Sequence, residues 1–286
     1  MNKVATTAEP ERDRPDLRPP EPEPAIPAWP ETHLAAHPDN RHGWLSRLRS
    51  YFILDPLIWV YTLALGTLSL ISSFFDRNGR IQHKFARLWS WLIMKSILSP
   101  VKVTGINLAA IDHSKPRVYA VTHASALDIP ILYVHLPSQF RIIFKSELLA
   151  YPFIGWHLKR SGQVCINQQN PAASIGAVKS ALRSLRSGMP LVIFPEGGRT
   201  RDGEIQPFLP GAFFLAIKAH AEIVPIALVG TFDLLPMNTY HIKCQPLEMR
   251  VGDPISTAGL TMHDIDSVSA KVKSAIESLH SAPTST

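Results

Sequence analysis

The chain has 286 residues, 45% hydrophobic and 18% charged, which is enough for one large domain or two small ones with a full core. Its net charge of +6 is compatible with nucleic acid, an anionic membrane surface or a phosphorylated substrate as partner. Nucleic acid is the least favoured, because Lys and Arg are not interleaved with aromatic residues. The isolated cysteines, Cys165 and Cys244, exclude a disulfide framework and a cysteine metal motif, and they favour a reducing compartment.

Residues 1–40 have a composition of their own. They contain nine prolines, many Glu, Asp and Arg residues, and few large apolar side chains. Such a segment cannot bury enough apolar surface to offset the entropy lost on ordering. We therefore predict a disordered, Pro-rich tail, and we expect no secretory signal because no apolar run lies near residue 1.

Residues 41–100 contain a long apolar run. Residues 56–75 carry no charge, and as a helix they would be about 30 Å long, the thickness of the hydrocarbon layer of a bilayer. Trp59 and Tyr61 lie toward the N-terminal end of the run, where an aromatic belt is expected. A second apolar stretch, residues 88–98, is interrupted by Lys95 and is typical of an interfacial helix. We predict a membrane-anchoring helical segment; the alternative is a buried pair of core helices.

From residue 101 to residue 286, candidate strands and helices alternate. The predicted strands are residues 117–122, 140–144, 163–166, 191–194, 223–229 and 247–251, and the predicted helices are residues 126–135, 148–160, 172–185 and 211–219. Near the end, one face of an amphipathic surface helix carries Ile265, Val268, Val272, Ile276 and Leu279. This alternation predicts an α/β domain with a mostly parallel central sheet flanked by helices, preceded by the apolar segment.

A histidine and an aspartate follow the predicted strand 117–122. His123 and Asp128 are five positions apart, and on a continuous helix their side chains would point about 140° apart. They can meet only if the chain bends at the strand end, which the small residues between them allow. A carboxylate on one imidazole nitrogen fixes the tautomer and leaves the other nitrogen free to accept a proton. The pair is a candidate general base, but one His-x-x-x-x-Asp pattern is weak and needs support from a second site.

A second candidate site follows the predicted strand 191–194. It is a Gly-Gly turn that carries an acid, a guanidinium and a hydroxyl: Glu196, Gly197, Gly198, Arg199 and Thr200. Glycines let backbone N–H groups approach an anion closely, and Arg matches phosphate oxygens. Lys145, after the predicted strand 140–144, is a further cation for an acidic substrate, although a solvated lysine fits that position equally well. The two loops together predict a base beside an anion-binding turn.

Other catalytic chemistries have little support. The twelve histidines include no His-Glu-x-x-His or comparable cluster, so no metal site is predicted. Ser125 lies two residues after His123, but the chain has no Gly-x-Ser-x-Gly turn. A covalent serine mechanism is therefore not predicted.

Several blocks in this order resemble the glycerolipid acyltransferase family, which includes the lysophosphatidic acid acyltransferases. They are His123-x-x-x-x-Asp128, Phe144-Lys145-Ser146-Glu147-Leu148, Phe194-Pro195-Glu196-Gly197-Gly198-Arg199-Thr200 and Val224-Pro225-Ile226-Ala227-Leu228. The resemblance covers residues 101–255, and the blocks together are specific where any one of them is not.

The resemblance implies a membrane enzyme of phospholipid biosynthesis. Such an enzyme moves a fatty acyl group from acyl-CoA or acyl carrier protein to the hydroxyl of lysophosphatidic acid, giving phosphatidic acid, with no cofactor beyond the acyl donor. His123 would be the base, Asp128 its orienting partner, and residues 196–200, with Arg199 foremost, the phosphate site. We expect the enzyme at the cytoplasmic face of the plasma (inner) membrane.

This sequence departs from the family's usual pattern at several positions. Gly198 and Thr200 replace Thr and Ser, which keeps the arginine and a hydroxyl. Gln168 lies where the family has a cation, so a second hypothesis is another lysolipid or an amino-acid lipid as acceptor. Other cations are available for the missing charge: Lys145, Lys159 and Arg160. A catalytically silent membrane adaptor and a hydrolase are the remaining alternatives.

Overall fold

The computed structural model describes residues 43–76, 78–112, 115–167 and 174–283. The predicted tail over residues 1–40 and the position of Gln168 lie outside the described residues. Residues 41–286 form one compact unit, which contains both the predicted anchoring segment and the predicted α/β domain.

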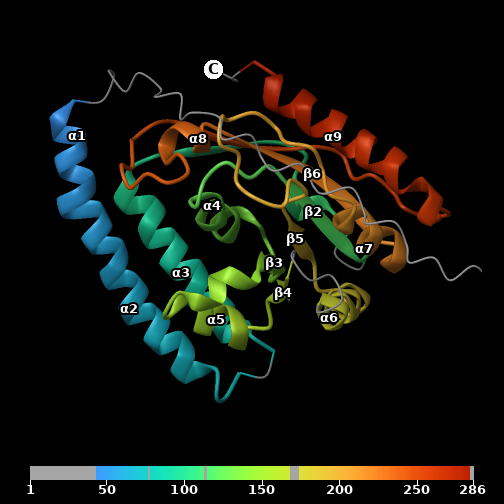
Figure 1. The fold of residues 1–286 in the computed structure, drawn as a ribbon, viewed down its shortest axis with the longest axis horizontal. Coiled ribbons are helices and arrows are strands. Elements are labelled where there is room, and N and C mark those ends of the chain that lie inside the picture. Colours follow the sequence, from blue (N-terminus) through green and yellow to red (C-terminus); the bar gives the residue numbers. More distant parts are fainter. Residues whose placement is uncertain (1–42, 77, 113–114, 168–173, 284–286) are drawn as a thin grey trace, which may run out of the picture. The chain divides into compact units, whose positions relative to one another are not determined.

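A seven-stranded sheet forms the centre of this unit (Figure 1), with the spatial order β1-β7-β6-β2-β5-β3-β4. The strands are β1 (Val101–Gly105), β2 (Arg117–Val121), β3 (Arg141–Lys145), β4 (Val164–Ile166), β5 (Leu191–Ile193), β6 (Glu222–Val229) and β7 (Leu247–Val251). Every neighbouring pair is parallel except β6 and β7. The prediction of a mostly parallel central sheet is therefore confirmed, and among the described strands only the edge strand β1 was not predicted.

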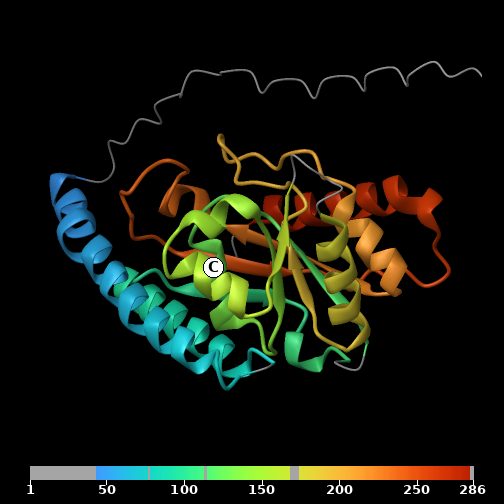
Figure 2. The ribbon, with the colours of Figure 1, turned by 60° about the horizontal axis from the view of Figure 1, so that its bottom comes forward.

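Helices cover both faces of the sheet (Figures 1 and 2). They are α1 (Trp44–Arg49), α2 (Asp55–Ser72), α3 (Arg80–Ile97), α4 (Asp128–His135), α5 (Ile154–Arg160), α6 (Ile175–Arg186), α7 (Gly211–Ala219), α8 (Thr231–Leu234) and α9 (Ile265–Ser281). Successive strand residues point to opposite faces. On β2, Tyr119 and Val121 therefore join the core beneath α3 and α4, whereas Val118 and Ala120 join the core beneath α6, α7 and α9.

The predicted helix 148–160 is wrong as a single element. The chain forms a 3-10 helix over Ser146–Ala150 and then begins α5 at Ile154. Pro152 explains the break, since proline disfavours helical backbone at the residue before it, and Tyr151 is extended with φ −81° and ψ 121°. The predicted helices 211–219 and 265–279 correspond to α7 and α9.

The apolar N-terminal run forms a continuous helix over Trp44–Ser72, in which a π-helical turn (Ser50–Leu54) joins α1 to α2. Within the described residues it is the one helix long and apolar enough to cross a membrane, and only 17% of its most apolar window is buried. Large apolar side chains exposed on it include Phe52, Ile53, Trp59, Val60, Leu63, Leu68 and Ile71. The alternative of a buried pair of core helices is therefore wrong for α2.

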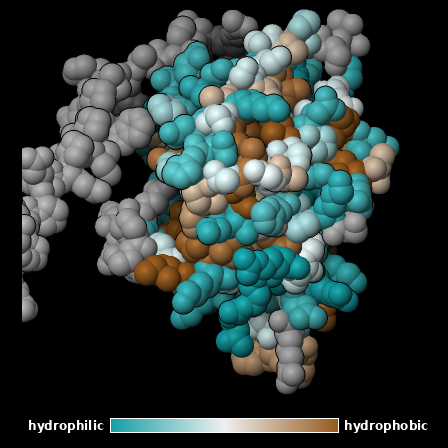
Figure 3. Space-filling model, turned by 90° about the vertical axis from the view of Figure 1, so that its right-hand side faces the viewer, coloured by the Kyte–Doolittle hydropathy of each residue, from teal (hydrophilic) through white to brown (hydrophobic). Residues whose placement is uncertain are grey.

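α3 packs between α2 and α4 (Figure 1). Its inner face belongs to the core through Ile93, Met94 and Ile97, while Leu88 and Trp91 on its outer face are 43% and 46% exposed. The stretch 88–98 is therefore one part of an amphipathic helix. By contrast, Figure 3 shows the side where α6, α7 and α9 lie, and there hydrophilic residues surround scattered hydrophobic ones.

Polar contacts attach α2 to its neighbours. Ser69 Oγ on α2 forms a 2.8 Å hydrogen bond with Nδ1 of His157 on α5. Two turns earlier on the same face of α2, Thr62 Oγ1 accepts a hydrogen bond from Trp89 Nε1 of α3 at 3.0 Å. Burial lowers the pKa of His157 to about 4, and burial, with Arg87 and Arg141 nearby, lowers the pKa of His83 to about 4 as well. Both imidazoles are therefore neutral in the folded protein near neutral pH.

We expect the protein to lose stability as the pH falls from about 6.5 toward about 4. Over this range His83 and His157 bind protons in the unfolded chain but not in the folded chain. This difference lowers the free energy of unfolding by up to about 3 kcal/mol per histidine. Denaturant unfolding at several pH values measures this slope. His83→Gln/His157→Gln should flatten it, while the exposed control His263→Gln should not. Identical slopes for all three proteins would contradict the assignment.

Candidate active site

Three loops emerge at one edge of the sheet. β2, β5 and β3 are parallel neighbours in that order, so their carboxyl ends lie on the same side. His123 follows β2, Glu196 follows β5, and Lys145 ends β3. Ligands of open α/β sheets bind outside the carboxyl ends of the strands. The backbone N–H of Thr200 donates to the carbonyl of His123 at 2.9 Å, so the two loops singled out in the sequence are in contact.

His123 and Asp128 meet as the predicted bend requires. His123 Nδ1 lies 2.8 Å from Asp128 Oδ2, and the same oxygen accepts the backbone N–H groups of Ala124 at 2.8 Å and Ser125 at 2.9 Å. Asp128 begins α4 and its side chain is fully buried. Its carboxylate therefore both closes the turn and holds the imidazole.

The imidazole of His123 is positioned on two sides. The ring of Phe194 stacks on it with the centroids 3.9 Å apart and the planes tilted by 21°. The His123 side chain is 18% exposed, and within the described residues its Nε2 has no hydrogen-bond partner. Nε2 is thus the nitrogen available to a substrate. The contact of Phe194 with the histidine was not predicted, although Phe194 begins the sequence block that contains the Gly-Gly turn.

Glu196 joins the two loops through the backbone. One carboxylate oxygen accepts the N–H of His123 at 2.8 Å and the other accepts the N–H of Gln206 at 2.9 Å. Burial raises the pKa of Glu196, and the two backbone hydrogen bonds oppose that rise. The structure thus gives Glu196 a bracing role that the sequence did not reveal, while its contact with a substrate stays a prediction.

The glycines bring a cation to the turn. Gly197 has φ +71°, a conformation that favours glycine. A side chain carbon added at Gly198 would lie 3.3 Å from Lys145 Nζ, so the ammonium occupies the space that a larger residue would fill. The side chains of Lys145 and Arg199 form no hydrogen bond or ion pair with another described residue. Both charges are therefore available to an anion.

The remaining candidates lie differently. The Thr200 hydroxyl is buried and donates to Asp202 Oδ1 at 2.7 Å, which holds the turn together, and its contact with a substrate stays a prediction. Lys159 and Arg160 line a groove between α2 and α5, where Arg160 Nε donates to Ser73 Oγ. No cluster of three potential metal ligands exists among the described residues. Of the three cations considered for the missing charge, only Lys145 lies at the turn.

Comparisons with known proteins agree on one family. Residues 100–229 match the family model described as Acyltransferase. The chain is 32% identical over 169 residues to the 1-acyl-sn-glycerol-3-phosphate acyltransferase of Limnanthes douglasii, over 58% of this chain and 58% of that protein. It is 34% identical over 186 residues to the enzyme of that name from Chlamydomonas reinhardtii, over 65% of this chain and 54% of that protein. The chain therefore spans less than two thirds of the length of these relatives.

The fold also resembles a crystal structure. This is the 1-acyl-sn-glycerophosphate (LPA) acyltransferase PlsC of Thermotoga maritima, with a TM-score of 0.66, 23% identity, and coverage of 85% of this chain and 97% of that chain. At this identity the likeness concerns the fold alone. Residues 100–229, which match the Acyltransferase family model, contain both the His–Asp pair and the Gly-Gly turn.

Proposed function

We propose that the chain transfers a fatty acyl group from a thioester to the hydroxyl of lysophosphatidic acid at a membrane surface, giving phosphatidic acid. One observation carries the proposal: a His–Asp base and two cations free of ion pairs lie in contacting loops. The base accounts for attack by an alcohol, and the cations account for a phosphate on the same molecule.

In the proposed reaction, Nε2 of His123 takes the proton of the acceptor hydroxyl while Asp128 holds Nδ1 and stabilises the imidazolium. The hydroxyl oxygen attacks the carbonyl carbon of the thioester. The new oxygen–carbon bond forms, the carbon–sulfur bond breaks, and the proton passes from the imidazolium to the leaving thiolate. No metal and no covalent enzyme intermediate enters this scheme.

The surroundings of Ser125 favour direct transfer over a covalent mechanism. The side chain is fully buried, its hydroxyl donates to the Leu235 carbonyl at 3.0 Å, and it accepts the Leu127 N–H at 3.2 Å. Because the hydroxyl is buried and both donates and accepts a structural hydrogen bond, it is not placed to attack an acyl group. The acceptor alcohol takes that role in the proposal.

We expect Arg199→Gln to raise the KM for lysophosphatidic acid about tenfold to a hundredfold, since a charge-assisted hydrogen bond contributes about 1.5–3 kcal/mol. The KM for the acyl donor should change little, because Arg199 binds the phosphate of the acceptor and not the donor. Steady-state kinetics with each substrate varied in turn separate the two constants. Lys179→Gln on α6 removes an exposed cation elsewhere and serves as control. A rise confined to the donor KM would contradict the assignment.

We place the exposed apolar face of α2 in the bilayer, at the cytoplasmic face of the plasma (inner) membrane. The length and exposure of the helix over Trp44–Ser72 support the first part. The second part is supported by Cys165 and Cys244, which are free thiols in keeping with a reducing compartment. Protease protection in membrane vesicles of known orientation tests the side.

A panel of substrates tests the whole proposal. The purified protein in phosphatidylcholine vesicles is given acyl-CoA or acylated carrier protein, with lysophosphatidic acid, other lysolipids or an amino-acid lipid as acceptor. The proposal requires phosphatidic acid as the fastest product. Faster acylation of another lysolipid would replace the acceptor, thiol release without an acceptor would indicate a hydrolase, and no thioester consumption at all would indicate an adaptor.

A further inference from the structure

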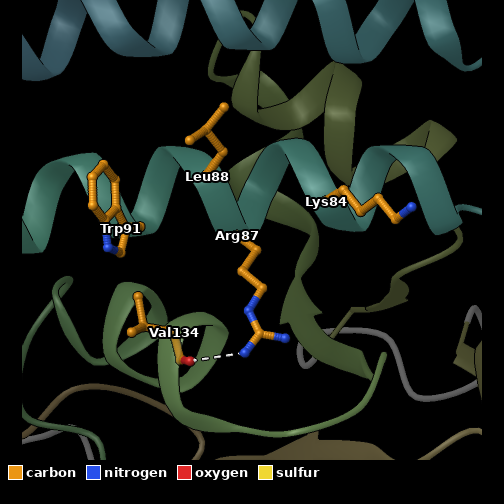
Figure 4. A pocket seen from close by; sticks show the side chains of 5 residues that line it. All are labelled: Lys84, Arg87, Leu88, Trp91 and Val134. Atoms are coloured by element: carbon orange, nitrogen blue, oxygen red, sulfur yellow. Dashed lines mark hydrogen bonds between the residues drawn. The ribbon is translucent and has the colours of Figure 1, made fainter.

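A groove lies between α3 and α4 (Figure 4). It has a volume of about 380 Å³ and is lined by Lys84, Arg87, Leu88, Trp91 and Val134. Val134 is near the C-terminal end of α4, whereas Asp128 is at its start. Six residues of helix separate them by about 9 Å along the axis, so the groove is not part of the catalytic loops.

The groove combines an apolar wall with two cations. Leu88, Trp91 and Val134 supply the wall. Figure 4 shows Arg87 extending from α3 toward α4, where its guanidinium donates to the Val134 carbonyl at 3.1 Å. That bond holds Arg87 at the edge of the groove and leaves its other N–H groups available. Lys84 lies one turn before Arg87 on the same face.

The exposed side of α3 is uniformly positive. The helix contains no Asp or Glu, and it exposes four cations: Arg80, Lys84, Arg87 and Lys95. None of the four forms an ion pair with another described residue. Lys95 Nζ lies 6.0 Å from the centre of the Trp91 ring, so an aromatic side chain is set among the charges. Cations mixed with an exposed Trp are typical of a helix at the interface of an anionic membrane.

The packing of α2 against α3 determines how deeply the groove lies in the membrane. α2 packs along the outside of α3 (Figure 1), and packed helix axes are about 8–10 Å apart. With α2 lying flat in one leaflet and its apolar face among the acyl chains, α3 lies at the level of the lipid headgroups. Near the C-terminal end of α2, a groove of about 360 Å³ repeats the composition with Leu70, Phe74, Trp156, Lys159 and Arg160. Cations thus lie beside the apolar helix in two places.

We propose that the groove between α3 and α4 binds the phosphate of an anionic phospholipid of the membrane surface. Lys84 and Arg87 hold the phosphate oxygens, and the upper part of an acyl chain lies against Leu88 and Trp91. This inference rests on the membrane placement of α2 proposed above and not on the acyl-transfer reaction. The protein should therefore prefer anionic membranes because of this one site, and not because of its overall net charge.

Vesicle flotation tests the proposal with the full-length protein. Phosphatidylcholine vesicles report the insertion of α2, and the gain in binding on adding phosphatidylglycerol reports the groove. Lys84→Gln/Arg87→Gln should reduce that gain about tenfold to thirtyfold, at about 1 kcal/mol per cation, and leave binding to neutral vesicles unchanged. Lys84→Gln/Lys95→Gln should weaken it too while keeping the Arg87 bond to Val134, which separates lipid binding from any loss of folding.

A matched control removes two exposed cations from α6 in the variant Lys179→Gln/Arg183→Gln. It should keep nearly the whole gain. An equal loss in this control, or no loss in the α3 variants, would overturn the proposal. Phosphatidylglycerol with brominated acyl chains should quench the tryptophan fluorescence of the wild type more than that of Trp91→Phe, and equal quenching would also overturn it. Failure of acyl transfer alone would leave these binding results unaffected.

Discussion

His123→Ala should lower the rate of acyl transfer by about two to four orders of magnitude, the usual contribution of a positioned general base. The imidazole is fixed by Asp128 at 2.8 Å and by the Phe194 ring, and its Nε2 is the nitrogen left open to the acceptor. Alanine removes the proton acceptor but keeps the backbone N–H that donates to Glu196 and the carbonyl that accepts from Thr200. The loss should therefore appear in kcat, measured as phosphatidic acid formed from lysophosphatidic acid and acyl-CoA.

Two comparisons keep that result specific. His263 is an exposed histidine just before α9, and His263→Ala should retain the wild-type rate. The thermal midpoint of His123→Ala should stay close to that of the wild type, since the backbone contacts survive. An unchanged kcat would remove His123 from the mechanism and with it the enzymatic proposal.

Asp128→Asn should lower kcat by about two to four orders of magnitude although the side chain keeps its shape. Asp128 Oδ2 accepts three N–H groups, one from the imidazole and two from the backbone of Ala124 and Ser125. An amide is a weaker acceptor without charge, and its own N–H group favours the tautomer that protonates Nε2 of His123. The nitrogen that should accept a proton is then occupied. Steady-state kinetics with lysophosphatidic acid and acyl-CoA measure this loss of kcat.

Asp128→Asn also weakens the turn after β2. A control variant should therefore lose hydrogen bonds from an aspartate at another turn. Asp264→Asn is such a control, because Asp264 Oδ2 accepts the N–H and hydroxyl of Thr261 ahead of α9. Asp128→Asn should cost about 1–3 kcal/mol of stability and Asp264→Asn should also lower stability, but only Asp128→Asn should lose activity. If the two lost activity in proportion to their stability, Asp128 would have a structural role alone.

The spacing of apolar residues predicted most helices and strands, because each of these segments follows either the helical or the strand periodicity. The strand 247–251 has the bounds of β7, and the helix 211–219 has those of α7. The break in the predicted helix 148–160 was also visible in principle, since Pro152 restricts the backbone of Tyr151. β1 escaped prediction because it is a short edge strand with Lys102 and Thr104 between its valines, a pattern that pairing with β7 stabilises and that is weak alone.

The amino-acid order was enough to identify an α/β domain, an apolar helix at its start, and a histidine and aspartate that a bend could bring together, because each depends on residues close along the chain. Contacts between distant segments were settled only by folding. Strand order puts β5 between β2 and β3, and this brings Lys145 to the space beside Gly198 and the Phe194 ring onto His123. It also turns the carboxylate of Glu196 toward the backbone of another loop. Periodicity carries no information on such pairings, since they depend on which strands become neighbours in the sheet.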